Sequence, residues 1–113
     1  MSELARIEAG GGGDRWVIRL IGEVDISNAG DVGRAIEAAV PNDALDVAID
    51  LSATRYLDSA GLSLLVRLSQ RLEARRQRLR LVIPMDSPVR AVVELTGLPK
   101  VLGVEPAPDA RTS

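Results

Sequence analysis

The chain has 113 residues, of which 46% are hydrophobic and 27% charged, and its net charge is −2. This length and composition indicate one globular domain with a hydrophobic core of its own. It has neither cysteine nor histidine, which excludes disulfides, thiolate nucleophiles, zinc sites of the usual nitrogen and sulfur type, and a histidine general base. The negative charge and the 2% aromatic content disfavour a general polyanion binder and a stacking platform for single-stranded nucleic acid.

The sequence shows no sign of membrane insertion or export. No apolar run approaches the roughly 20 residues needed to span a bilayer, and the N-terminus lacks a basic-then-apolar signal pattern. We therefore expect a cytoplasmic protein with a single domain over residues 1–105. Residues 106–113 hold two prolines, small residues and charges, and this composition predicts a disordered tail.

The first quarter of the chain predicts two strands joined by a hairpin. Residues 4–8 alternate apolar and polar side chains, as a short strand does. The glycine run at residues 10–13 predicts a flexible hairpin loop. A phosphate loop is disfavoured because no Lys-Ser/Thr pair follows and no helix opens after the run. Residues 16–21 predict the second strand, extending to about residue 25.

A helix and a buried strand come next. Residues 29–40 carry apolar side chains close to a 3.6-residue period, and Ser27 or Asn28 is suited to cap this helix. Residues 44–51 are mostly apolar between two aspartates. That pattern predicts an inner strand that is buried on both faces.

The second half predicts two more helices and two more strands. Residues 62–72 carry a broad apolar face, residues 79–83 form a strand, and residues 101–104 form a short last strand. The third helix lies between these strands. Ser87 caps it, with Pro88 at the first helical position, and Gly97 closes it.

The predicted element order is β-β-α-β-α-β-α-β. Strand–helix–strand units imply parallel pairing, and the opening hairpin adds an antiparallel pair. We therefore expect an α/β fold in which helices pack on a mixed β-sheet.

The segment before the helix at 62–72 is the strongest candidate for chemistry. Asp58 and Ser59 lie at the predicted helix N-terminus, where the first backbone N–H groups have no intrahelical partner and the helix dipole is positive. A phosphate carried by a hydroxyl there meets a favourable anion environment. Small Ala60 and Gly61 leave the backbone accessible to a partner. Ser59 is thus an ordinary N-cap, a phosphoacceptor, or both.

Three motifs occur in sequence order between residues 22 and 98, within a resemblance that runs over about residues 16–104. They are Gly22-Glu23-Val24-Asp25-Ile26 with Asn28-Ala29, then Asp50-Leu51-Ser52 with Leu57-Asp58-Ser59-Ala60-Gly61-Leu62, then Ser87-Pro88-Val89-Arg90 with Leu95-Thr96-Gly97-Leu98. Together they resemble the motifs of STAS domains, in particular those of bacterial anti-sigma factor antagonists. The chain differs at Ala53, where many relatives have Gly, and at Ala60, where some relatives carry a second hydroxyl.

The resemblance implies a STAS-like fold and a phosphorylation-controlled switch. The unphosphorylated form would bind an anti-sigma factor with serine kinase activity and free the sigma factor for transcription. The kinase would bind ATP and phosphorylate Ser59, which ends binding, and a separate serine phosphatase would reverse this. The chain itself would then be no enzyme and need no cofactor, and nucleic acid would not be a partner.

The resemblance also implies a carboxylate close to the phosphorylatable loop, at Asp25. From the residues alone, Asp25 is equally a turn residue, and Asp58 a helix cap. The expected partner-binding surface comprises Asp25, Asn28, Asp58, Ser59, Ala60, Gly61 and Leu62. The two carboxylates predict neither a metal site nor catalysis, because no other residue completes an active site.

Two alternatives remain open from the sequence. The row Arg67, Arg71, Arg75 and Arg78, which Arg55 and Arg80 could extend, is either a basic binding stripe or a solvated helix face. STAS domains also serve as non-switching accessory subunits, for example of lipid-transport ATPases, or as scaffolds of stress-sensing assemblies. In those roles the same loop and helix would form a constitutive interface.

Overall fold

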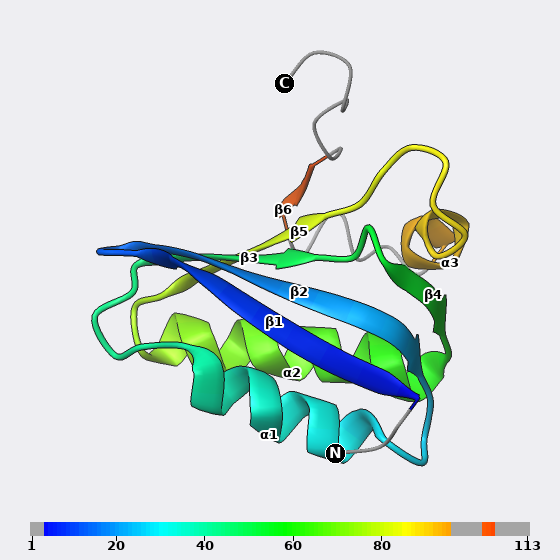
Figure 1. The fold of residues 1–113 in the computed structure, drawn as a ribbon, viewed down its shortest axis with the longest axis horizontal. Helices are drawn as coiled ribbons and strands as arrows, with labels where there is room; N and C mark the ends of the chain where they lie inside the picture. Colours follow the sequence, from blue (N-terminus) through cyan, green and yellow to red (C-terminus); the bar gives the residue numbers. More distant parts are fainter. Residues whose placement is uncertain (1–3, 96–102, 106–113) are drawn as a thin grey trace.

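A six-stranded mixed sheet with two long helices across one face forms the framework, in a computed structural model that describes residues 4–95 and 103–105. In chain order the elements are β1 (Ala5–Gly12), β2 (Arg15–Val24), α1 (Ala29–Ala39), β3 (Asp46–Asp50), β4 (Thr54–Leu57), α2 (Ser59–Ala74), β5 (Arg78–Val82), α3 (Arg90–Leu95) and β6 (Gly103–Glu105). The strand order is β1-β2-β3-β5-β6, with β4 paired to β2 off this path. Among the described strands, β1 and β2 pair antiparallel and the other pairs are parallel. The expected mixed α/β sheet is confirmed, and α1 and α2 lie side by side across one face (Figure 1).

The glycine-rich segment is mostly strand, which corrects the loop predicted for residues 10–13. β1 continues to Gly12, which pairs with Arg15, so only Gly13 and Asp14 form the turn. Gly13 has a φ of 60°, a value that glycine adopts readily in two-residue hairpin turns. The prediction failed because glycine runs are typical of loops, whereas pairing with β2 decides the local structure here.

β4 is a strand that the sequence pattern does not predict. After β3 ends at Asp50, the chain bends and β4 pairs with the last residues of β2, with Glu23 opposite Tyr56 and Val24 opposite Leu57. The register shifts at Gly22, whose φ is 106° and where a Cβ would lie 2.2 Å from the Leu4 carbonyl oxygen. The observed order is therefore β-β-α-β-β-α-β-α-β, and β4 leads directly into α2.

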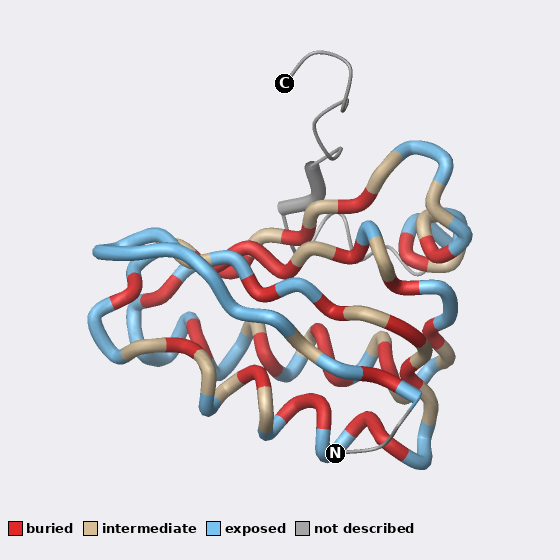
Figure 2. Tube along the Cα trace, in the orientation of Figure 1, coloured by how far each residue is buried: buried red, intermediate tan, exposed pale blue. Residues whose placement is uncertain are grey.

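The core lies between the sheet and the two long helices. Residues Ile18 and Leu20 of β2 are buried, whereas Val17 and Arg19 are exposed on the opposite face (Figure 2). Such alternation is expected for a sheet with one covered face. The largest fully buried side chains include Ile18, Leu20, Ile36, Ile49, Leu51, Leu65, Leu72, Leu81 and Ile83.

The last third of the chain departs from the predicted boundaries. α3 begins at Arg90, two residues after Pro88, and the Ser87 hydroxyl accepts from the Val89 N–H (3.2 Å), as a capping serine does. The predicted closure at Gly97, the start of the predicted strand at 101–104 and the tail at 106–113 lie outside the described residues. Within residues 4–95 and 103–105, no helix is long and apolar enough to cross a bilayer.

Candidate functional site

The site lies where β2 and β4 end at one edge of the sheet. Val24 and Leu57 are register partners on these parallel strands, and the Asp58 N–H donates to the Val24 carbonyl (3.3 Å). Asp25 follows β2, Asp58 follows β4, and Ser59 is the first residue of α2. The structure thus brings together three residues that the sequence singled out.

Asp58 caps α2, as one of its two predicted roles requires. Its carboxylate accepts from the backbone N–H groups of Ala60 (2.9 Å) and Gly61 (3.1 Å). Side-chain caps of this kind contribute about 1 kcal/mol. The backbone at Ala60 and Gly61 was expected to be accessible to a partner. This expectation is corrected, because both N–H groups donate to Asp58 and are not free for a partner or a phosphate.

Ser59 is the first residue of α2 and is exposed. None of the residues that the structure describes forms a hydrogen bond with its hydroxyl. Ala60 and Leu62 are half-buried beside it. The Ser59 hydroxyl is therefore accessible to a modifying enzyme, and α2 does not depend on it as a cap.

The Asp25 carboxylate is held inside a tight turn. It accepts from both the hydroxyl and the backbone N–H of Ser27, the latter at 2.8 Å. These hydrogen bonds, that of the Ser27 hydroxyl foremost, hold the pKa of Asp25 below its usual value. Asp25 therefore carries a full negative charge at neutral pH. The sequence predicts Ser27 only as a candidate helix cap and not as a partner of Asp25, although an aspartate followed two residues later by serine is itself a turn signal.

The buried side chain of Asn28 stabilises the same turn. Its side chain accepts from the Asp25 N–H and donates to the Glu23 carbonyl, both at 2.9 Å. It is 1% exposed and occupies the N-cap position of α1, as one of the two predicted candidates, but its side chain makes no cap hydrogen bond to the helix. The reason is that its amide is used to join the end of β2 to the turn. Asn28 is therefore buried and acts on the surface only by fixing the backbone position of Asp25.

Gly61 likewise lies under the surface. It is buried, and a Cβ there would lie 2.9 Å from Leu57 Cδ2 and 3.4 Å from Val24 Cγ1. A glycine is needed because the first turn of α2 packs directly on the two strand ends. Of the residues expected to bind a partner, Ser59 is thus exposed, Asp25, Asp58, Ala60 and Leu62 are half-buried, and Asn28 and Gly61 are buried.

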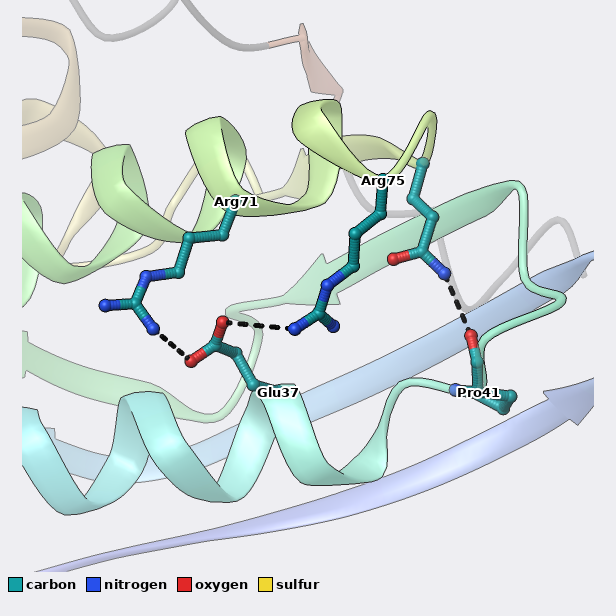
Figure 3. Close-up of polar contacts among 5 residues, drawn as sticks. Glu37, Pro41, Arg71 and Arg75 are labelled. Atoms are coloured by element: carbon teal, nitrogen blue, oxygen red, sulfur yellow. Dashed lines mark hydrogen bonds and ion pairs between the residues drawn. The ribbon is translucent and has the colours of Figure 1, made fainter.

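The arginine row of α2 lies toward the other end of the helix and is not one continuous stripe. Arg71 Nη1 contacts Glu37 Oε2 of α1 at 2.9 Å, and Arg75 Nη2 lies 4.0 Å from Glu37 Oε1 (Figure 3). Arg78 belongs to β5. Two of the arginines therefore join the two helices.

Among the described residues, the site offers the exposed hydroxyl of Ser59 and the carboxylates of Asp25 and Asp58. Both carboxylates are positioned by hydrogen-bond donors, Asp25 by Ser27 and Asp58 by the first turn of α2. The described part of the chain contains no group of three or more carboxylates that could hold a metal ion. The site is suited to accept a modification and to present negative charge to a partner.

Known proteins place this geometry in a family. The family described as "Mlab, STAS domain" matches residues 7–103. No curated protein matches the sequence. An anti-sigma factor antagonist from Mycobacterium paratuberculosis is 26% identical, with 96% of this chain and 89% of that chain covered and a TM-score of 0.77. The anti-sigma factor antagonist SpoIIAA in its unphosphorylated form is 24% identical, with 96% and 91% covered and a TM-score of 0.72.

The phosphorylated form of the Bacillus cell fate determinant SpoIIAA is similar as well, at 23% identity, 96% and 95% coverage and a TM-score of 0.66. The fold is thus shared with solved structures over nearly the full length of each. The family match independently covers most of the sequence. The chain therefore belongs to the STAS domain family.

Proposed function

We propose that this chain is an anti-sigma factor antagonist controlled by phosphorylation of Ser59. The observation that carries the proposal is the free, exposed Ser59 hydroxyl at the first position of α2, beside the capping Asp58 and the ionised Asp25. The similarity to anti-sigma factor antagonists supports it, and one of these proteins has been solved in unphosphorylated and phosphorylated forms.

In the unphosphorylated state, the exposed part of the site docks on an anti-sigma factor with serine kinase activity. Docking releases the sigma factor and permits transcription in the bacterial cytoplasm. The chain acts here as a binding protein, and ATP is held by the partner kinase.

Phosphorylation then ends docking. The Ser59 hydroxyl oxygen forms a bond to the γ-phosphorus of ATP, the bond from that phosphorus to the β–γ bridging oxygen breaks, ADP leaves, and the hydroxyl proton passes to a base of the kinase. A separate phosphatase restores the hydroxyl by hydrolysis, with water as the nucleophile and inorganic phosphate as the product.

The electrostatic effect of the phosphate is local. It adds roughly −1.5 to −2 charges, next to the negative charges of Asp58 and Asp25. The positive end of the α2 dipole favours this charge in the free protein, so the fold is retained. In a complex, the added charge must be desolvated beside two carboxylates, and this repulsion weakens binding.

Phosphate mapping tests the modification. The protein is incubated with a purified anti-sigma kinase from its own genome and ATP, and the products are mapped by mass spectrometry. We expect one phosphate on Ser59, which is absent from Ser59→Ala and still present in the matched variant Ser63→Ala, one turn further along the exposed surface of α2. Binding to an active kinase without any phosphate would instead favour the constitutive role of an accessory subunit or scaffold.

A charge-mimicking variant tests the switch. Ser59→Asp should weaken kinase binding by roughly 10- to 100-fold, measured by isothermal titration calorimetry, because it places a third carboxylate at the site. Its free energy of unfolding should stay within about 0.5 kcal/mol of wild type, since the substitution is exposed and lies at a helix N-terminus. Equal affinity of the two proteins would contradict the switch.

A further inference from the structure

Two turns of the same construction follow neighbouring strands. In Asp25-Ile26-Ser27, the aspartate carboxylate accepts from the backbone N–H and the hydroxyl of the serine. In Asp50-Leu51-Ser52, after β3, the aspartate accepts from the same two groups of Ser52, with the N–H at 2.9 Å. The two turns therefore share the same hydrogen bonds between aspartate and serine and hold different residues between them.

That middle residue is buried in one turn and exposed in the other. Leu51 is 0% exposed, whereas Ile26 is 86% exposed. The Asp-x-Ser turn itself does not force its middle side chain into water, since the second turn directs a large apolar side chain into the core. The exposure of Ile26 is thus a property of its place in the fold.

The residues on both sides of Ile26 are fixed by hydrogen bonds. Its turn is fixed on both sides by the Asp25–Ser27 bonds and by the buried Asn28, whose side chain bonds to the Asp25 N–H and the Glu23 carbonyl. The Ala29 N–H donates to the Asp25 carbonyl as well (2.9 Å). An isoleucine side chain has few rotamers. Little conformational entropy remains to be lost when such a residue is buried in a complex, which favours binding.

Charged and polar groups lie close to Ile26. The ionised Asp25 precedes it, and Asp58 and exposed Ser59 lie at the same edge of the sheet. A single exposed apolar residue is common on protein surfaces and needs no explanation. An exposed apolar side chain on a hydrogen-bonded turn, close to charged groups and at a site proposed for docking, has the arrangement of an interface hot spot, which is an apolar anchor within a polar rim.

We infer that Ile26 is the apolar anchor of the docking surface and enters an apolar pocket of the partner protein. A cationic side chain at the rim of that pocket meets the Asp25 carboxylate. This inference rests on the proposed function, because it takes the partner to be the anti-sigma factor. It extends the proposed function by stating what the partner surface contains, which is an apolar pocket with a cationic side chain at its rim.

Three substitutions test the anchor. The probe is the purified anti-sigma kinase that binds the wild-type chain, and affinity is measured by calorimetry at constant salt. Ile26→Ala should raise the Kd by roughly 10- to 100-fold, the effect of leaving most of an isoleucine side chain unburied, and Ile26→Val by only about fourfold, the effect of one methylene. The matched control Leu45→Ala should leave the Kd unchanged, since Leu45 is 57% exposed but precedes β3, at the opposite end of the parallel strands.

The salt dependence of the affinity distinguishes the apolar contribution of Ile26 from the electrostatic contribution of Asp25. The effect of Ile26→Ala should persist at high ionic strength, whereas the affinity loss of Asp25→Asn should shrink as salt screens the ion pair. Thermal unfolding of the Ile26 variants should match wild type, because the side chain is in water in the free protein. A Kd for Ile26→Ala within twofold of wild type would overturn the anchor and leave the proposed function standing. Failure of every anti-sigma kinase of the genome to bind the wild-type chain would overturn both.

Discussion

The two ends of the α1–α2 layer use polar side chains in opposite ways. At the carboxyl end of α2, side chains connect different elements, with Glu37 of α1 contacting Arg71 and Arg75 of α2 and with Gln77 donating to the Pro41 and Ala44 carbonyls (2.9 and 3.0 Å). At the amino end, Asp25, Asn28 and Asp58 bond to backbone groups at most five residues away.

This difference indicates that the polar side chains at the two ends have different structural roles. The long-range contacts at the carboxyl end hold elements together, and the local contacts at the amino end fix the shape of a surface. Because a local turn completes its own hydrogen bonds, it leaves the Ser59 hydroxyl and the Ile26 side chain pointing into solvent. Substitutions at the carboxyl end should therefore change stability alone, and those at the amino end should change binding.

Asn28→Ala should have the largest effect, because Asn28 is buried and its polar side chain holds the turn of the site through two hydrogen bonds. Removing its amide leaves the Asp25 N–H and the Glu23 carbonyl without their partner. We expect a loss of about 2–3 kcal/mol in the free energy of unfolding, measured by urea denaturation. Kinase affinity should fall as well, since the turn that presents Asp25 and Ile26 loses its support.

The matched variant Asn42→Ala separates this effect from the loss of an asparagine in general. Asn42 is exposed between α1 and β3, so its replacement should change stability by no more than about 0.5 kcal/mol. If Asn28→Ala kept wild-type affinity under conditions where it is folded, binding would not depend on the shape of the turn.

Gln77→Ala should lower stability without affecting binding. Gln77 is 3% exposed, and its Nε2 group supplies hydrogen bonds to the loop between α1 and β3. We expect a loss of about 1–2 kcal/mol by urea denaturation, with the Kd for the kinase within twofold of wild type. Gln70→Ala is the control, because Gln70 is exposed on α2. A large change in Kd for Gln77→Ala would show that the two ends are coupled.

The sequence predicts those features of the site that local chemistry determines. Asp58 and Ser59 open α2 as expected, because capping depends on residues within one helical turn. Features that depend on distant strands were missed. β4 exists through pairing with β2, and the glycine run is a strand through the same partner. Asn28 looked like a helix cap because its sequence position fits one, while its amide is directed to β2 instead.

Ser27→Ala should have the smallest effect, and it isolates the electrostatics of Asp25. The Ser27 hydroxyl is the main cause of the lowered pKa of Asp25, so its removal should raise that pKa toward the usual value of 3.8. A group with a lowered pKa stabilises the fold at a pH above its unfolded value, and that contribution is lost as the pH falls through the folded value. The stability difference between wild type and Ser27→Ala should therefore be present at neutral pH and vanish in acid.

NMR titration of the Asp25 carboxyl carbon measures the shift in pKa directly. Ser52→Ala, which removes the same hydroxyl from the Asp50 turn, should leave the pKa of Asp25 unchanged. An unchanged pKa in Ser27→Ala would mean that the charge of Asp25 is set by other neighbours, and that this turn presents an ionised carboxylate without help from its serine.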